Sequence, residues 1–132
     1  MKDSRKEADR WYGQAENDLA YARHGFHGKF YAQVCFQCHQ VGEKALKAIH
    51  FATLNSRIVL GHSLVKLGRQ VGIEEELADR LAILDQYYIP TRYPNGIPDG
   101  APFEMYTRSQ AEEALVTATD VLSLAKERIS QV

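Results

Sequence analysis

Apolar residues recur every three or four positions through four long stretches of this chain, and this spacing is the strongest constraint on its fold. Such spacing places apolar side chains on one face of an α-helix, whereas a half-buried strand would need strict alternation. No stretch of the sequence alternates in that way. We therefore expect an all-α fold, an antiparallel up-and-down bundle of four to five helices.

The periodic stretches also give approximate helix bounds. We expect long helices over about 5–23, 30–54, 74–88 and 109–129, and a short helix over about 62–72. Gly25 and Gly28 are expected to end the first helix, because glycine weakens helices. Ser109 and Glu112 have the spacing of a capping box at the start of the last helix.

All four prolines lie in one segment, residues 89–106, between the last two predicted helices. A loop of this length in a small domain is usually either functional or disordered. Its aromatic residues argue against disorder, so we predict an ordered Pro/Gly loop packed on the bundle. Pro90 and Pro94 restrict the backbone around Arg92, and a guanidinium held in this way suits phosphate or carboxylate recognition.

Length and composition favour one globular domain over residues 1–132. The chain has 45% hydrophobic and 25% charged residues, which is ordinary for such a domain. The N-terminal sequence has no apolar stretch typical of a signal peptide, and no window approaches the ~20 apolar residues of a membrane span. We expect a cytoplasmic protein with no membrane association and with its two cysteines reduced.

Cys35, Cys38 and His39 match the C-x-x-C-H pattern of covalent haem attachment. That attachment normally follows export, and here the pattern lies inside a predicted helix. The two cysteines are one turn apart and can instead pack in a helix seam as small apolar residues. A zinc site with His24 and His27 is the other alternative, but the glycines around them do not favour it. We expect no cofactor and no metal.

A polar stripe borders the apolar face of the second predicted helix. Its members are spaced i, i+3, i+4 and i+7, so they share one side of the helix. Together with a histidine and two residues of the proline-rich loop they form the predicted nucleotide-binding site: Gln40, Glu43, Lys44, Lys47, His62, Arg92 and Tyr93. Tyr87, Tyr88 and Tyr93 offer faces on which a base could stack. The alternative is that Glu43 and Lys47 form an ordinary surface pair, and that Arg92 pairs with Glu43 or another acid at the core edge and only anchors the loop.

Charge is unevenly distributed, although the net charge is only −1. Residues 29–70 contain six basic side chains and one acidic side chain, Glu43. This polarity favours an anionic partner or a self-complementary contact over an evenly solvated surface.

Four segments resemble the HEPN family, named for nucleotide binding in higher eukaryotes and prokaryotes. They are AENDLAYA at 15–22, QVGEKALKA at 40–48, HSL at 62–64 and YIPTRYP at 88–94, in the family's order. The resemblance is to the branch that carries Arg-Tyr-Pro, where nucleotide binding is the inferred role. It implies a helical bundle, a homodimer, and partnership with a small nucleotidyltransferase protein.

Some HEPN proteins resemble metal-independent ribonucleases whose motif is an arginine, usually followed by a polar residue, then four to six residues, then a histidine. There the histidine would act on the 2′-hydroxyl and the arginine would stabilise the phosphorane charge. This chain departs from that pattern, because no histidine follows Arg92. Arg57 and His62 have the spacing, but they lie in a loop before the short helix.

We therefore predict a non-catalytic nucleotide-binding and interaction module, a homodimer whose ligand carries phosphate, with RNA as a further candidate. The first alternative is a toxin-like ribonuclease that uses His62 with Arg57 or Arg92. The second is a purely structural dimerisation domain.

Overall fold

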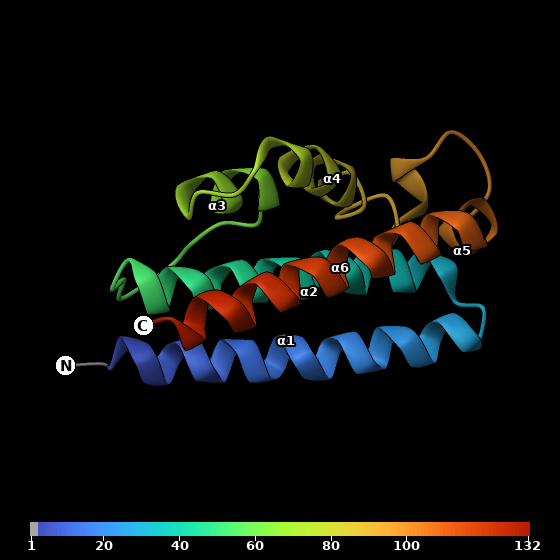
Figure 1. The fold of residues 1–132 in the computed structure, drawn as a ribbon. Coiled ribbons are helices and arrows are strands. Elements are labelled where there is room, and N and C mark those ends of the chain that lie inside the picture. The colour runs from blue at the N-terminus through green and yellow to red at the C-terminus, as the bar shows by residue number, and fades with distance from the viewer. Residues whose placement is uncertain (1–2) are drawn as a thin grey trace.

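The structure is a computed structural model that describes residues 3–132, and every regular element within them is helical (Figure 1). This confirms the predicted all-α fold, with the up-and-down order of the long helices. The elements are α1 (Ser4–His27), α2 (Tyr31–Thr53), α3 (Leu64–Gln70), α4 (Glu75–Asp85), the 3₁₀ helix η1 (Pro94–Gly96), α5 (Pro102–Met105) and α6 (Arg108–Ser130).

The three long helices α1, α2 and α6 form the body of the molecule, and the shorter α3 and α4 lie on one side of it (Figure 1). Helix α1 runs opposite to α2 and α6, and α4 runs opposite to α6. The start of α1 and the end of α6 therefore lie at the same end, where Arg5 donates to the backbone oxygen of Val132 at 3.0 Å.

Helix α2 is the centre of the fold, because α1, α3, α4, α5 and α6 all pack on it. Alanine and other small residues line its seams with α1 and α6, which lets these backbones approach closely. Cys35 and Cys38 belong to this set. The fully buried side chains of α2 are Cys35, Cys38, His39, Val41, Ala45, Leu46, Ala48 and Ile49. Burial of this apolar face is the main source of stability for a domain of this kind.

Glycines allow two close helix contacts. A Cβ atom added to Gly42 would lie 3.0 Å from Leu64, so α3 approaches α2 at this glycine. A Cβ added to Gly25 would lie 3.3 Å from Val34, at the α1–α2 contact. The prediction that Gly25 ends the first helix is therefore wrong, since α1 continues to His27 and Gly28 is its C-cap. Packing against α2 compensates for the low helix propensity of Gly25.

Two predicted helix ends also differ from the structure. Helix α4 stops at Asp85 rather than near Tyr88, because the chain tightens into successive i+3 to i turns before Pro90. Thr107 and Gln110, not Ser109 and Glu112, form the capping box of α6. Both pairs have the same spacing, and helix α6 begins one residue earlier than predicted.

The proline-rich segment is ordered, as predicted. It contains η1 and α5, and it buries Thr91 and Pro102 against the bundle. The Thr91 hydroxyl donates to the backbone oxygen of Tyr87, which closes the turn before η1.

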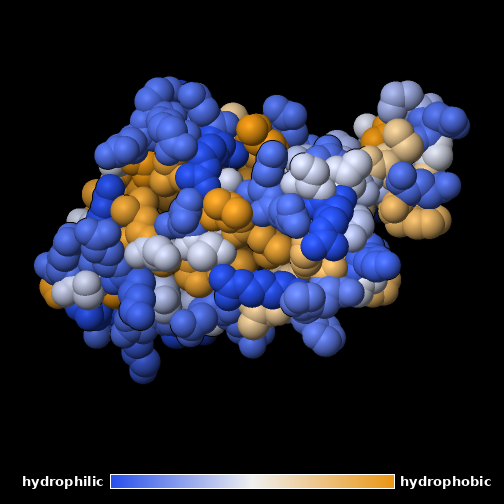
Figure 2. Space-filling view, turned by 45° about the vertical axis from the view of Figure 1, so that its right-hand side comes forward, coloured by the Kyte–Doolittle hydropathy of each residue, from blue (hydrophilic) through white to orange (hydrophobic). Residues whose placement is uncertain are grey.

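Figure 2 shows one face of the molecule, on which hydrophobic residues gather between hydrophilic margins. Within residues 3–132, no helix combines the length and apolarity that a membrane crossing requires.

Candidate functional site

Glu43 connects helix α2 to the loop that precedes α3. Its Oε2 accepts a hydrogen bond from Lys47 Nζ at 3.0 Å, and its Oε1 accepts one from His62 Nδ1 at 2.8 Å. Lys47 and Glu43 are only 5% and 7% exposed, whereas the His62 side chain is 60% exposed. The buried carboxylate therefore holds the exposed imidazole in one orientation and leaves its Nε2 available to solvent or a ligand.

Tyr88 joins His62 to Arg92. The His62 ring stacks on Tyr88 with a centroid distance of 5.0 Å and an interplanar angle of 20°. The Arg92 guanidinium carbon lies 4.8 Å from the centroid of the same tyrosine ring. Because both groups contact one ring, the imidazole and the guanidinium are no farther apart than the sum of their two distances from the Tyr88 centroid. They are close enough to contact one small ligand.

Arg92 is held by aromatic rings and by the backbone rather than by an acid. Its guanidinium carbon lies 4.5 Å from the Phe36 centroid and 5.2 Å from that of Tyr93. Its Nε donates to the backbone oxygen of Tyr88 at 2.8 Å. Among residues 3–132, no carboxylate forms an ion pair with it, and the side chain is exposed. The alternative in which Arg92 pairs with Glu43 is therefore wrong.

A buried polar network supports the site from below. His39 is fully buried, and its Nε2 donates to the backbone oxygen of His62 at 2.9 Å and to Asp85 Oδ1 at 3.2 Å. Asp85 also accepts from the backbone N–H groups of Leu64 and Val65, so it caps the start of α3. Burial raises the pKa of Asp85, but these hydrogen bonds outweigh burial and leave the pKa below its ordinary value.

Lys44 lies on the side of the predicted stripe that faces α1. Its ammonium group pairs with Asp18 of α1, which also accepts from Gln14 at 2.8 Å. Lys44 and Gln14 border a shallow cleft of about 580 Å³ that also contains Trp11. Lys47 connects the two sides, since its Nζ is bonded to Glu43 and lies 5.4 Å from the Trp11 centroid. Lys44 and Lys47 thus meet carboxylates of the chain itself.

Of the seven predicted site residues, contacts link five to Tyr88, either directly or through His39, His62 or Arg92. The side-chain amide of Gln40 lies 3.2 Å from His39 Nδ1, which places it at the edge of the same network. Tyr93 is half exposed beside Arg92. Lys47 is bonded to Glu43 but buried, and Lys44 points to α1. The five that gather are Gln40, Glu43, His62, Arg92 and Tyr93.

A family model described as the HEPN domain matches residues 8–129. The chain belongs to the HEPN family. This confirms the resemblance that the four sequence segments indicated.

Solved structures of other HEPN-like chains have the same fold. A crystal structure from Thermus thermophilus superposes with a TM-score of 0.85 at 37% identity, covering 92% of this chain and 97% of that one. An archaeal HEPN homologue gives a TM-score of 0.79 at 32% identity, covering 98% and 99%. An HEPN domain protein from Thermotoga maritima gives 0.74 at 26% identity, covering 93% and 99%.

One relative in the sequence comparison has a name that describes a function. A Methanocaldococcus jannaschii protein named "Putative toxin MJ1304" is 28% identical over 131 residues, which covers 89% of this chain and 85% of that protein.

Sequence reasoning missed two residues that build the site of this HEPN domain. Phe36 lies one turn before Gln40 on the same stripe of α2, and its ring supports Arg92. Helical spacing from Gln40 could have indicated it. Asp85 caps α3 from the end of α4, and no sequence signal connects the two. Tyr88 provides the aromatic face, whereas Tyr87 turns away from this site and is buried.

The structure also bears on the cysteine and arginine alternatives. Cys35 and Cys38 are fully buried in the core, and burial raises the pKa of the Cys35 thiol to about 12. Both thiols act as packing groups, since no thiolate is available. Within the described residues, no group of three His, Cys, Asp or Glu side chains could hold a metal ion. Arg57 is exposed in the loop between α2 and α3. Within the described residues, no hydrogen bond or ring contact joins it to His62.

Proposed function

We propose that this HEPN domain binds a phosphate-bearing ligand, most simply a nucleotide, at the surface formed by Arg92, His62 and Tyr88. The observation that carries the proposal is the Arg92 guanidinium, which is exposed, has no carboxylate partner among residues 3–132 and lies against three aromatic rings. Its terminal nitrogens can therefore meet a phosphate without first breaking an ion pair.

Each neighbouring residue has a separate role in the proposed site. His62 supplies a second hydrogen-bond donor near Arg92, and the buried Glu43 positions its ring. Tyr93 is 50% exposed and offers a face for a base. Gln40 supplies an amide at the edge of the site. Lys44 and Lys47 contribute positive charge from a distance rather than direct contacts, because Asp18 and Glu43 occupy their ammonium groups.

The assembly is also part of the proposal. From the family resemblance we propose a homodimer that acts with a small nucleotidyltransferase protein. The name of the Methanocaldococcus jannaschii relative is compatible with a toxin-like role.

A thermal-shift screen against nucleoside mono-, di- and triphosphates tests the binding site. A ligand at about 100 times its dissociation constant adds roughly 2.7 kcal/mol to the free energy of unfolding, which raises Tm by several degrees. We expect Arg92→Ala to abolish the shift. Arg108→Ala is the matched control, because Arg108 is also exposed and lies 5.0 Å from an aromatic centroid, that of Phe26, away from the site.

The outcomes separate the proposal from its alternatives. A shift in Tm that remains in Arg92→Ala would show that the ligand binds elsewhere on the molecule. No shift with any nucleotide would contradict nucleotide binding and favour a structural dimerisation domain, which sedimentation of the purified chain would then check.

The bond between His62 and Glu43 favours a second candidate, RNA cleavage. A carboxylate that orients an exposed imidazole is the usual arrangement of a general base, here facing the 2′-hydroxyl of a bound RNA. Arg92 would stabilise charge on the phosphate. Incubation with labelled single-stranded RNA would show cleavage that His62→Ala removes and Arg57→Ala leaves unchanged. If Arg57→Ala instead removes cleavage, the Arg57 and His62 pair carries it.

A further inference from the structure

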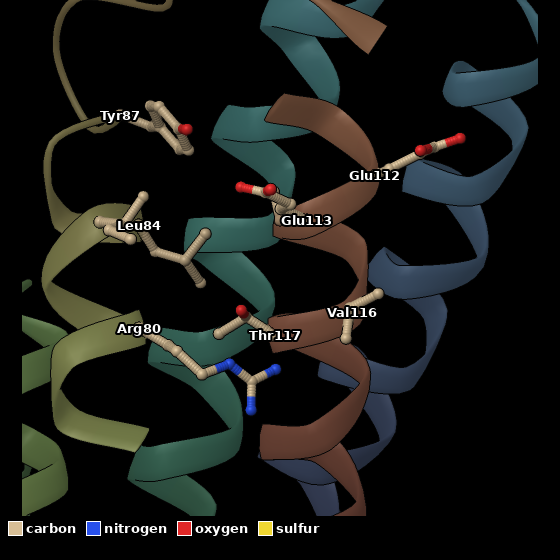
Figure 3. Close-up of a pocket in the computed structure, with 9 residues that line it drawn as sticks. Arg80, Leu84, Tyr87, Glu112, Glu113, Val116 and Thr117 are labelled. Atoms are coloured by element: carbon tan, nitrogen blue, oxygen red, sulfur yellow. The ribbon is translucent and has the colours of Figure 1, made fainter. Parts of the chain in front are cut away.

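A second hollow lies between α4 and α6, and neither Arg92 nor Tyr88 lines it. Its volume is about 360 Å³, near the lower limit for small-molecule sites. Figure 3 shows Leu84 and Tyr87 on one wall and Glu113 and Thr117 on the other, with Arg80 at the lower end. Ile83, Leu84 and Ala114 make most of the surface apolar.

Within residues 3–132, two hydroxyl groups and one carboxylate of this cleft form no hydrogen bond or ion pair. Tyr87 and Thr117 are more than nine-tenths buried, and neither hydroxyl forms a hydrogen bond with any residue in 3–132. Among these residues no fully buried side-chain nitrogen or oxygen lacks a partner, so both hydroxyls are open to the cleft. The other helical threonines, such as Thr119, bond to a backbone oxygen one turn earlier. Figure 3 shows the Thr117 and Tyr87 hydroxyls directed into the cleft, toward the side where Glu113 lies. Both hydroxyls can therefore bond to solvent or to a ligand that enters the cleft.

Glu113 supplies the charge of the site. Its carboxylate forms no ion pair within the described residues, whereas its neighbour Glu112 pairs with Arg108. Tyr87 and Glu113 line the same cleft. Burial raises the pKa of Tyr87 to about 12, and Cys35 and Glu113 add smaller contributions. Arg80, the cation at the other end, is already paired with Asp120 at 2.7 Å and with Glu76 at 3.8 Å.

These features select the chemistry of the ligand. An anion would meet the unpaired Glu113 carboxylate and be repelled. A neutral alcohol would leave that charge without a counterion. A primary ammonium group has three donors, and the cleft offers three acceptors, the Glu113 carboxylate and the hydroxyls of Tyr87 and Thr117. The apolar wall beyond them suits a short alkyl chain.

We propose that the cleft between α4 and α6 binds a primary aliphatic amine, with its ammonium at Glu113, Tyr87 and Thr117 and its chain on Leu84, Ile83 and Ala114. This site is independent of the phosphate ligand proposed at Arg92. It requires no covalent step and no cofactor.

The test uses n-pentylammonium chloride and the neutral 1-pentanol in titrations of the isotope-labelled whole chain, followed by amide shifts in NMR spectra. We expect pentylammonium to shift amides around Leu84, Ala114 and Thr117, and pentanol to bind more weakly. Glu113→Gln should raise the dissociation constant about tenfold. Glu112→Gln is the matched control, because Glu112 also lines the cleft but its carboxylate points away from Tyr87 and Thr117 and pairs with Arg108 (Figure 3). Its effect should stay below about twofold.

A stability measurement separates binding from a structural role. Thr117→Val should weaken amine binding while leaving the urea midpoint unchanged or higher, because the hydroxyl it removes has no hydrogen-bond partner within residues 3–132. Nα-acetyl-lysine N-methylamide carries the same ammonium group on a peptide backbone. If it binds more tightly than pentylammonium, the natural ligand is a lysine of a partner protein. If it binds less tightly, the natural ligand is a free amine. The proposal is overturned if pentylammonium leaves the cleft amides unshifted, if pentanol binds equally well, or if Glu113→Gln behaves as Glu112→Gln does.

Discussion

The cations near helix α2 fall into two groups that differ in burial and in partners. Lys47 is 5% exposed and bonded to Glu43, and Lys44 pairs with Asp18 of α1. Arg92, by contrast, is exposed and lies against aromatic rings, with no acid beside it among the described residues. A buried paired cation mainly stabilises the fold, because leaving it unpaired is costly. An exposed cation without an acid stabilises little and remains available to a ligand.

Glu43 belongs to both groups, and removing it should give the largest effect. Glu43→Ala leaves the nearly buried Lys47 ammonium without a carboxylate and His62 without its anchor. We expect the free energy of unfolding to fall by about 3 kcal/mol in urea titrations. The control is Glu112→Ala, whose exposed pair with Arg108 should be worth less than about 1 kcal/mol. Equal losses in the two variants would show that the burial of the Lys47 pair does not matter.

Asp85 comes next, because it supports the exposed group without touching a ligand. Asp85→Ala removes the bond to His39 and the cap of α3, and we expect a loss of about 2 kcal/mol. Its folded-state pKa is lowered, so the ionised carboxylate stabilises the fold above the unfolded-state pKa. That contribution disappears as the pH falls through the folded-state pKa.

Urea titrations from about pH 7 down to about pH 3 measure this dependence, since the unfolded-state pKa of aspartate is about 3.9. Wild type should lose stability at the acidic end, and Asp85→Ala should lose less over the same range. Asp79→Ala, an exposed change on the same helix, should lose stability at acidic pH by the same amount as wild type. If wild type and Asp85→Ala lose the same stability between about pH 7 and about pH 3, the pH dependence comes from other carboxylates.

The sequence predicts the frame of this molecule well, because helical periodicity depends on local spacing. The stripe of Gln40, Glu43 and Lys47 follows from it, and the ordered loop around Arg92 follows from the prolines and aromatic residues of that segment. The partners of these residues do not. Whether Glu43 meets Lys47 and His62 or Arg92 depends on how the loop after α2 folds back, and that contact joins residues far apart in sequence.

The same limit explains Gly25 and Asp85. A glycine that would end an isolated helix is tolerated in α1 because Val34 of α2 packs against it. An aspartate at the end of α4 caps α3 because the two short helices lie side by side on α2. Both depend on tertiary packing, which outweighs local propensity and is not encoded in spacing.

Lys44 tests the paired group at a more exposed position. Its side chain is 25% exposed, so its bond to Asp18 is screened more than the Lys47 pair is. Lys44→Ala should lower the free energy of unfolding by about 1 kcal/mol. A double-mutant cycle with Asp18→Ala isolates the pair energy. A coupling energy near zero would show that Lys44 is available to an anionic ligand after all, and would enlarge the proposed site toward Trp11.

Arg92 should give the smallest change in stability. Its contacts with Phe36, Tyr88 and Tyr93 are at the surface, where each cation–π contact contributes about 0.5–1 kcal/mol. The side chain also regains rotamer freedom when it is released, which offsets part of that sum. We expect Arg92→Ala to change the free energy of unfolding by less than about 1 kcal/mol in the absence of ligand.

Arg92→Lys sharpens this last comparison, because it keeps the charge but loses the planar fork that stacks on rings and meets phosphate at two points. If the role is ligand recognition, the lysine variant should keep wild-type stability in urea and still lose most of the nucleotide-induced shift in Tm. A loss above about 2 kcal/mol in either variant would place Arg92 with Lys47, as an anchor of the proline-rich loop, since a loss of that size indicates a buried structural contact.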